Sequence, residues 1–303
     1  MARTTGSRKH SFDIVEPGFT HQGQEYVHHS GLRVKDTAFQ RLLPRQGIVL
    51  GLLAAAIAAS FIADWHATLL TLIALLTIYY IFQIVFDLFL TYRSLSGVNE
   101  SIVSDQEIKD HRGGWPAYTI LCPLYREEVV LPQFVRAMEK LDYPVDKLQI
   151  LLLLEEDDQA TIKAAKKMKL SKQFQVVVVP HSLPKTKPKA LNYGLKKAAG
   201  EYVVIYDAED IPEPKQLKRT ALAFSKADPS VACVQSKLDY YNPRQNVLTR
   251  VFTAEYALWF DLVLPGLQSI KAPIPLGGTS NHFQVELLKE LGGWDAFNVT
   301  EDA

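Results

Sequence analysis

Hydrophobic positions divide the chain into a polar N-terminal part, two long apolar runs and a region of short alternating elements. The first apolar run covers residues 47–63 and the second covers residues 67–90, with Asp64, Trp65 and His66 between them. At about 1.5 Å per residue in a helix, the runs measure roughly 26 Å and 36 Å, which brackets the ~30 Å hydrocarbon core of a bilayer. We expect two transmembrane helices within residues 47–91. The alternative is a buried helical hairpin of a soluble protein.

The basic residues predict how such a helix pair is oriented. Arg33, Lys35, Arg41 and Arg45 precede the first run, and the turn between the runs carries no Lys or Arg. By the positive-inside rule, the N-terminus and everything after Arg93 lie in the cytoplasm. The sequence therefore predicts a multi-pass protein of the plasma (inner) membrane, in contact with membrane lipid, whose C-terminal domain is cytoplasmic.

From residue 118 onward, short apolar runs alternate with stretches of helical period. Apolar runs predict strands at 118–122, 148–154, 174–179, 202–206 and 231–234, and the stretches between them predict helices at 129–141, 161–169, 189–199 and 214–226. The strands are apolar at successive positions, which indicates a sheet covered on both faces. Strand–helix alternation then predicts a doubly wound, mostly parallel α/β domain.

These patterns give the expected domain organisation. We expect a flexible cytoplasmic segment over 1–46, the transmembrane pair over 47–91, a linker over 92–117 and the α/β domain over 118–303. Composition narrows the partners, because Lys+Arg and Asp+Glu both total 33 and give a formal net charge of zero. A nucleic-acid partner is not expected, since such proteins normally carry a basic excess. Cys122 and Cys233 lie among apolar residues and are expected to be buried thiols.

Polar clusters follow the predicted strands. They occupy residues 123–128, 155–158, 185–189 and 207–210, and they are rich in carboxylates and lysines. One such cluster alone would be read as a solvated loop. In doubly wound sheets, however, ligands bind beyond the carboxyl ends of the strands, so four clusters at successive strand ends favour a site. Carboxylates beside lysines are the composition that holds a divalent cation and a diphosphate together.

The stretches CPLYREE, EEDD, KTKPKALNYGL, DAED, PLGGTSNHF and GGWDAFNVTED follow one another between residues 122 and 302. In this order they resemble the motifs of glycosyltransferase family 2, which has the GT-A fold. The similarity is greatest to the membrane-anchored, cellulose-synthase-like branch, and it covers residues 118–302. Arg126 departs from the family pattern, which usually has Asn at that position.

The resemblance implies a role for each motif. The nucleotide-binding residues it implies are Pro123, Tyr125, Glu127, Asp157, Asp158 and Lys187. It implies that Asp207 and Glu209 bind Mg²⁺ or Mn²⁺, with Asp210 as an alternative ligand because Glu209 is one methylene longer than the usual Asp. The acceptor-binding residues it implies are Gly278, Thr279, Trp294 and Glu301, although a Gly-Gly-Trp corner can equally serve packing. Asp302 corresponds to the family's catalytic base.

The resemblance also implies an activity. A family 2 enzyme of this branch moves a sugar from a UDP-sugar donor to a hydroxyl of a saccharide or lipid-linked acceptor, with inversion, in β-glucan or exopolysaccharide synthesis. The alternatives are transfer to a polyprenyl phosphate and a non-catalytic nucleotide-sugar-binding paralogue. The sequence ends at Ala303, before the Gln-x-x-Arg-Trp motif of processive family members. We therefore expect a fragment of a longer synthase that has little activity alone.

Overall fold

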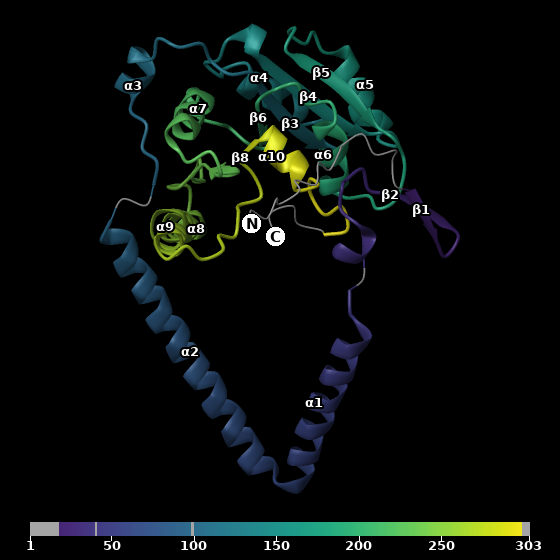
Figure 1. Cartoon of the computed structure of the whole chain (residues 1–303), viewed down its shortest axis with the longest axis vertical. Helices are drawn as coiled ribbons and strands as arrows, with labels where there is room; N and C mark the ends of the chain where they lie inside the picture. The colour runs from purple at the N-terminus through teal and green to yellow at the C-terminus, as the bar shows by residue number, and fades with distance from the viewer. Residues whose placement is uncertain (1–17, 40, 98–99, 299–303) are drawn as a thin grey trace, which may run out of the picture. The chain divides into compact units, whose positions relative to one another are not determined.

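The computed structural model describes residues 18–39, 41–97 and 100–298, and these residues form two compact units (Figure 1). The first unit contains the described residues up to 39 together with 102–237 and 276–298. The second contains residues 41–97, 100–101 and 238–275. The first unit is the α/β domain, and the second holds both long apolar helices.

A six-stranded sheet forms the centre of the first unit, in the order β5-β4-β3-β6-β8-β7. Ile120 of the central strand pairs with Ile150 on one side and Val204 on the other, both in parallel register. Strand β8 runs antiparallel to its neighbours β6 and β7, so the sheet is mostly parallel, as the sequence predicts. The strand bounds are β3 (Tyr118–Leu124), β4 (Leu148–Glu155), β5 (Phe174–Val179), β6 (Tyr202–Ile205), β7 (Cys233–Gln235) and β8 (Asn281–Gln284).

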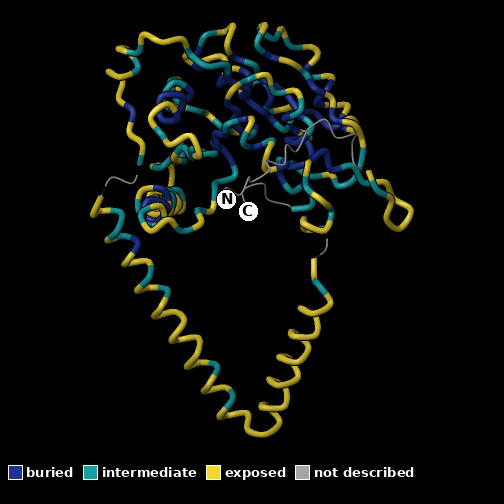
Figure 2. The backbone as a smooth tube through the Cα atoms, viewed as in Figure 1, coloured by how far each residue is buried: buried dark blue, intermediate teal, exposed yellow. Residues whose placement is uncertain are grey.

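Helices cover both faces of this sheet, which is why its strands are apolar at successive positions. Leu152 of β4 belongs to a core that includes residues of α4 (Leu131–Met138), α5 (Gln159–Lys167) and α7 (Gln216–Lys226). The adjacent Leu153 belongs to a second core with α6 (Lys187–Leu195) and α10 (Val285–Glu290). Figure 2 shows these strands as the most deeply buried part of the chain. The predicted doubly wound α/β architecture is confirmed.

Strand β8 was not predicted, because its sequence Asn-His-Phe-Gln has no apolar run. It is nevertheless buried at His282, whose exposed fraction is 0%. The imidazole Nδ1 lies 2.7 Å from the Tyr118 hydroxyl, and Nε2 lies 3.2 Å from the Ser236 hydroxyl. These two hydrogen bonds allow a polar side chain to occupy the core.

We expect the buried histidine to make the stability of the first unit depend on pH. Burial lowers the pKa of His282 from 6.5 to about 3, because the charged form loses its hydration. As the pH falls below 6.5, this histidine binds a proton in the unfolded chain but not in the folded chain. The free energy of unfolding therefore decreases as the pH falls from 6.5 toward 3. Denaturant titrations at several pH values measure this slope, and replacing His282 by Asn should flatten it. Equal slopes for both proteins would contradict the assignment.

Part of the N-terminal segment expected to be flexible is folded against the first unit. Residues 18–39 contain a hairpin of β1 (Gly18–His21) and β2 (Gln24–Val27) and the short helix η1 (Val34–Asp36). The amide of Val27 donates to the carbonyl of Leu183 at 2.7 Å, and Gly31 donates to Gly292 at 2.8 Å. The expected linker likewise contains α3 (Asp105–Asp110), and η2 (Val145–Lys147) precedes β4.

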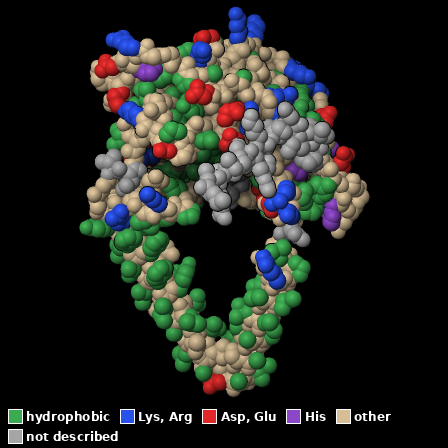
Figure 3. Space-filling model, viewed as in Figure 1, with side chains coloured by type: hydrophobic (Ala, Val, Ile, Leu, Met, Phe, Trp, Pro, Cys, Tyr) green, Lys and Arg blue, Asp and Glu red, His purple; other side chains and the backbone are tan. Residues whose placement is uncertain are grey.

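The second unit is built on α1 (Pro44–Ala63) and α2 (Trp65–Leu95), which meet at Asp64. The Asp64 carboxylate accepts from the Ala67 amide at 3.0 Å and caps α2. Figure 3 shows the surfaces of both helices covered by hydrophobic side chains. The remaining elements are α8 (Val247–Ala257), the π-helical segment η3 (Leu258–Val263) and α9 (Leu264–Ser269).

Helix α9 packs directly on the C-terminal end of α2. A side chain at Gly266 would put its Cβ only 2.5 Å from the Leu90 carbonyl oxygen, so only glycine permits this approach. The Arg93 guanidinium donates to the Ser269 hydroxyl at 3.1 Å and to the Ser269 carbonyl at 3.3 Å. Residues 238–275 therefore fold with the apolar helices rather than with the sheet.

Candidate active site

A pocket of about 340 Å³ opens at the carboxyl ends of the central parallel strands. Its size lies at the lower end of the range typical of small-molecule sites. The lining side chains come from the ends of β3, β4 and β6 and from the segment that begins α6. They are Pro123, Leu124, Tyr125, Glu127, Leu153, Glu155, Lys185, Thr186, Lys187, Ala190, Asp207, Ala208 and Glu209.

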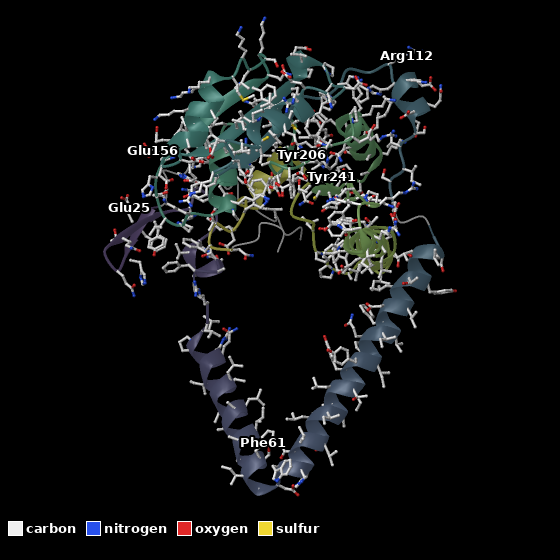
Figure 4. All side chains as sticks on the ribbon, turned by 180° about the vertical axis from the view of Figure 1, so that it is seen from behind. Glu25, Phe61, Arg112, Glu156, Tyr206 and Tyr241 are labelled. Carbon is white, nitrogen blue, oxygen red and sulfur yellow. The ribbon has the colours of Figure 1, made fainter. Side chains whose placement is uncertain are left out.

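The pocket wall contains an ion pair between Lys187 and Asp207. The Lys187 Nζ lies 2.7 Å from Asp207 Oδ1 and also donates to the carbonyl of Gly278 at 2.9 Å. Both side chains are partly exposed, at 25% for Lys187 and 29% for Asp207, so a ligand in the pocket can reach them. Asp207 follows Tyr206, which is labelled in Figure 4 and is fully buried beyond the end of β6.

The other two carboxylates of the DAED stretch have different surroundings. Glu209 is exposed and lines the pocket. Asp210 instead folds back, so that its Oδ2 accepts from the Asp207 amide at 2.6 Å and from the Thr279 hydroxyl. Burial raises the pKa of Asp210 to about 6, and the Thr279 hydrogen bond opposes that rise. Asp210 therefore shapes the turn that presents Asp207, while Glu209 remains directed to the pocket.

Tyr125 and Glu127 line the pocket beyond β3. The Tyr125 ring is 43% exposed, and the Arg126 guanidinium carbon lies 5.1 Å from its centroid. Arg126 has a positive φ of 60°, which turns the chain and brings its amide to Asp158 Oδ2 at 2.5 Å. Desolvation raises the pKa of Glu127, and repulsion from Glu209 adds to the rise. A cationic group in the pocket would relieve that repulsion.

The EEDD stretch, which begins at the last residue of β4, contributes Glu155 to the pocket lining instead of the expected Asp157 and Asp158. Asp157 pairs with Lys185, and Asp158 caps α5 by accepting from the Thr161 amide at 3.2 Å. Neither lines the pocket, whereas Glu155 does. The signal that identifies Glu155 is the two-residue period of a strand: Glu155 shares the face of Leu153, which also lines the pocket.

Glu155 is held by a buried lysine that sequence reasoning did not single out. Lys189 is 0% exposed, and its Nζ lies 2.9 Å from Glu155 Oε2 and 3.4 Å from the carbonyls of Pro180 and Ser182. Burial raises the pKa of Glu155, and the Lys189 ammonium opposes that rise. This side chain thus fixes one wall of the pocket to the chain segment that leads to Lys187.

Replacing Lys189 by Met is expected to lower the free energy of unfolding by about 3 kcal/mol, because Glu155 would be left buried without its counter-charge. The double variant Lys189→Met/Glu155→Gln should recover most of this loss, since it removes both charges. Denaturant titration followed by tryptophan fluorescence, to which Trp294 in the same core as α6 contributes, measures the effect. If Lys189→Met were as stable as the wild type, the Lys189–Glu155 pair would not contribute to the free energy of unfolding.

The residues implied for the acceptor lie partly within the described chain. The carbonyl of Gly278 accepts from Lys187, and the Thr279 hydroxyl contacts Asp210 and the Ile205 carbonyl. Trp294 is only 6% exposed and meets the Phe283 ring edge-on at 5.8 Å between centroids. Its ring therefore packs in the core, as the alternative reading of the Gly-Gly-Trp corner expects. Glu301 and Asp302 lie outside the described residues.

The pocket has a donor set that fits a hard divalent cation. Among the described residues, no group of three or more His, Cys, Asp or Glu side chains is arranged to hold a metal ion. Asp207 and Glu209 do line the same pocket, next to Lys187. Mg²⁺ and Mn²⁺ prefer oxygen ligands, and Mg²⁺ commonly takes one or two protein carboxylates and completes its shell with phosphate oxygens and water. A pair of carboxylates beside a lysine suits such a cation together with a diphosphate.

A comparison with protein families gives a match over residues 116–303, to the family described as glycosyltransferase like family 2. The probable glycosyltransferase YdaM of Bacillus subtilis (strain 168) is 27% identical over 189 residues, which cover 62% of this chain and 45% of that protein. The probable glucomannan 4-beta-mannosyltransferase 7 of Oryza sativa subsp. japonica is 29% identical over 199 residues, covering 63% and 34%. The chain thus spans less than half the length of these relatives.

Among solved structures, the mannosyltransferase PcManGT from Pyrobaculum calidifontis, in complex with GDP-Man and Mn²⁺, has a similar fold. The TM-score is 0.50 at 24% identity, and the match covers 63% of this chain and 53% of that one. The alignment supports the GT-A architecture of the first unit.

Proposed function

The chain belongs to glycosyltransferase family 2, and from this premise we propose that it transfers a hexose from a nucleoside-diphosphate sugar to an acceptor hydroxyl, with inversion. The observation that carries the proposal is the Lys187–Asp207 pair, 2.7 Å apart, in a pocket at the carboxyl ends of parallel strands. Ligands of doubly wound sheets bind at such an edge.

Different pocket residues would bind different parts of the nucleotide-sugar donor. The exposed ring of Tyr125 offers a flat apolar surface for a nucleotide base. The Lys187 ammonium supplies positive charge where the diphosphate would lie. Asp207 and Glu209 would hold Mg²⁺ or Mn²⁺, which when bound neutralises negative charge on the departing diphosphate. Fixed charges of this kind usually contribute the largest share of catalysis.

The transfer itself needs a proton acceptor on the other side of the anomeric carbon. In the proposed reaction the acceptor hydroxyl oxygen bonds to that carbon, the bond to the diphosphate breaks, and Asp302 takes the hydroxyl proton. The assignment of Asp302 rests on the Thr-Glu-Asp sequence at residues 300–302. A single displacement of this kind converts an α-linked donor into a β-linked product.

A location in the membrane is supported by α1 and α2. Their mean hydropathies are 2.1 and 2.3, and none of the residues in their most apolar windows is buried. The core helix of a soluble protein would be covered by other elements, so the surfaces of these helices favour lipid over the soluble alternative. With the positive-inside rule, this supports a catalytic domain in the cytoplasm.

The acceptor class is proposed from the relatives. Glucomannan 4-beta-mannosyltransferases of Oryza sativa and Arabidopsis thaliana are among them, which supports synthesis of a β-linked polysaccharide. The motif resemblance favours a UDP-linked donor, whereas the mannosyltransferase names make a GDP-linked donor the obvious comparison.

Radiolabelled UDP-glucose, UDP-N-acetylglucosamine and GDP-mannose, supplied to membranes that contain the full-length protein, test the proposal. We expect one donor to label a saccharide product in a reaction that needs a divalent cation, with membranes lacking the protein as the control. Label that extracts into organic solvent as a sugar phosphate lipid would instead support the polyprenyl-phosphate alternative. No protein-dependent transfer from any donor would contradict the proposed function.

A further inference from the structure

Residues 18–39, here called the N-terminal strap, lie against two segments, of which the first leads into residues that line the candidate active site and the second contacts that first segment. Their middle part is core rather than surface, since His28 is 1% exposed and His29 is 2% exposed. The hairpin that begins the strap carries Glu25, which is labelled in Figure 4. The buried polar residues of the strap are His28, His29, Ser30 and Thr37, and a segment that only connected the chain to α1 would not need to bury them.

The first of the two segments is the chain that leads into α6. The Val27 amide donates to the carbonyl of Leu183 at 2.7 Å, and Tyr26 forms a parallel bridge with the same residue. Two residues later comes Lys185, which lines the pocket together with Lys187. The strap therefore extends the pairing of β2 onto the segment that supplies the lysines of the pocket.

The second segment is residues 292–298, which immediately precede the stretch containing Asp302. The Gly31 amide donates to the Gly292 carbonyl at 2.8 Å, and the Ala38 amide donates to Asp295 Oδ2 at 2.6 Å. The Phe297 ring lies 5.1 Å from the Phe39 ring, centroid to centroid, in a cluster that also contains Phe19 and Tyr26. Strap and segment are thus joined by backbone hydrogen bonds and by aromatic packing.

One buried side chain joins all three pieces. Asn192 of α6 is 0% exposed, and its amide group donates to the carbonyls of His28 at 3.2 Å and Trp294 at 2.8 Å. Its carbonyl oxygen accepts from the Trp294 amide at 2.9 Å. In addition, the Thr186 hydroxyl donates to the Ala296 carbonyl at 2.6 Å. The lysine segment and residues 292–298 are therefore linked both directly and through the strap.

We propose that the N-terminal strap is a positioning element of the glycosyl-transfer site: together with residues 292–298 it holds in place the segment that carries Lys187. This inference rests on the proposed function, because it gives Lys187 its role. A group misplaced by about 1 Å can cost 10²-fold in rate, so a transferase gains from a rigid support behind the lysine segment of its pocket. Asn192 is the positioning residue at the junction, and Phe39 and Gly31 fix the strap to residues 292–298.

Two strap variants test the proposal without altering the pocket. Phe39→Ala removes a half-buried ring of the aromatic cluster. Gly31→Ala places a Cβ 3.2 Å from the Gly292 Cα, so that the two backbones must separate. Phe39→Leu keeps apolar bulk and serves as the conservative variant. Thr20→Ala, at an exposed position of the hairpin, is the matched control.

The readouts are hydrogen exchange of the Trp294 and Phe297 amides, affinity for UDP and GDP, and turnover in the transfer assay. We expect exchange about tenfold faster in Phe39→Ala and Gly31→Ala, because the local opening that exposes these amides becomes easier. Turnover should fall about tenfold, while nucleotide affinity stays within about twofold of the wild type. Phe39→Leu should recover most of both losses, and Thr20→Ala should match the wild type.

Two results would overturn the proposal. Unchanged exchange in both strap variants would mean that the strap does not hold residues 292–298. Faster exchange with unchanged turnover would mean that the strap stabilises the fold without positioning the site. Failure of the proposed function is a separate result: the wild type would then transfer no sugar from any donor, whatever the exchange experiment gives.

Discussion

Replacing Asp207 by Asn is expected to lower the rate of sugar transfer about 10²- to 10³-fold, and to remove most of the acceleration by divalent cations. The substitution keeps the shape of the side chain but removes the negative charge that faces Lys187 at 2.7 Å and would hold the cation. Initial rates measured over a range of Mn²⁺ and Mg²⁺ concentrations give both quantities.

The control for this substitution is Asp228→Asn, which removes the same charge from an exposed loop after α7. Its transfer rate should equal that of the wild type. If Asp207→Asn retained wild-type transfer and the same cation requirement, Asp207 would have no part in the reaction and the cation site would have to be sought elsewhere.

Replacing Asp302 by Asn is expected to lower turnover about 10²- to 10⁴-fold while leaving nucleotide affinity unchanged, because a general base acts on the acceptor hydroxyl and not on the donor. The matched control is Glu290→Gln at the exposed end of α10. Turnover and UDP or GDP affinity, measured on the same preparations, separate the two effects. Parallel losses of turnover and affinity would place Asp302 in donor binding, and no loss at all would favour the non-catalytic alternative.

The central strands were predictable because they are apolar at successive positions. Residues 148–155 of β4 have one core on each side, so the sequence itself carries the signature of a buried parallel strand. Strand β8 was missed because its polar residues are satisfied by distant partners, as His282 is by Tyr118. A hydrogen bond between residues 164 positions apart leaves no local pattern in the sequence.

The fold of the N-terminal strap was also not predictable from the local sequence pattern. Its glycines, histidines and polar residues predict a flexible segment, because they lack a hydrophobic period. What holds the strap is backbone pairing with Leu183 and Gly292 and an aromatic cluster drawn from both ends of the chain. Such contacts are invisible until the intervening domain has brought the segments together.

The location of the site was predictable because its residues lie at the carboxyl ends of the strands. The rule that ligands bind at strand ends brought Tyr125, Lys187 and Asp207 to one pocket. It did not decide which residue of the EEDD stretch faces that pocket. Glu155 is the last residue of β4 and keeps its face, whereas Asp158 is used to cap α5. The last residue of a strand therefore has to be known before the carboxylates that follow it can be assigned to the pocket or to a helix cap.

The central claim is that Asp207 and Lys187 form a binding site for a divalent cation and a nucleoside diphosphate. Calorimetric titration of UDP and GDP into the purified protein, with and without Mn²⁺, tests it most directly. We expect one of the two nucleotides to bind much more tightly with Mn²⁺ than without it, and Asp207→Asn to abolish that difference. Equal affinity with and without Mn²⁺ in the wild type, or a Mn²⁺ effect that survives in Asp207→Asn, would contradict the claim.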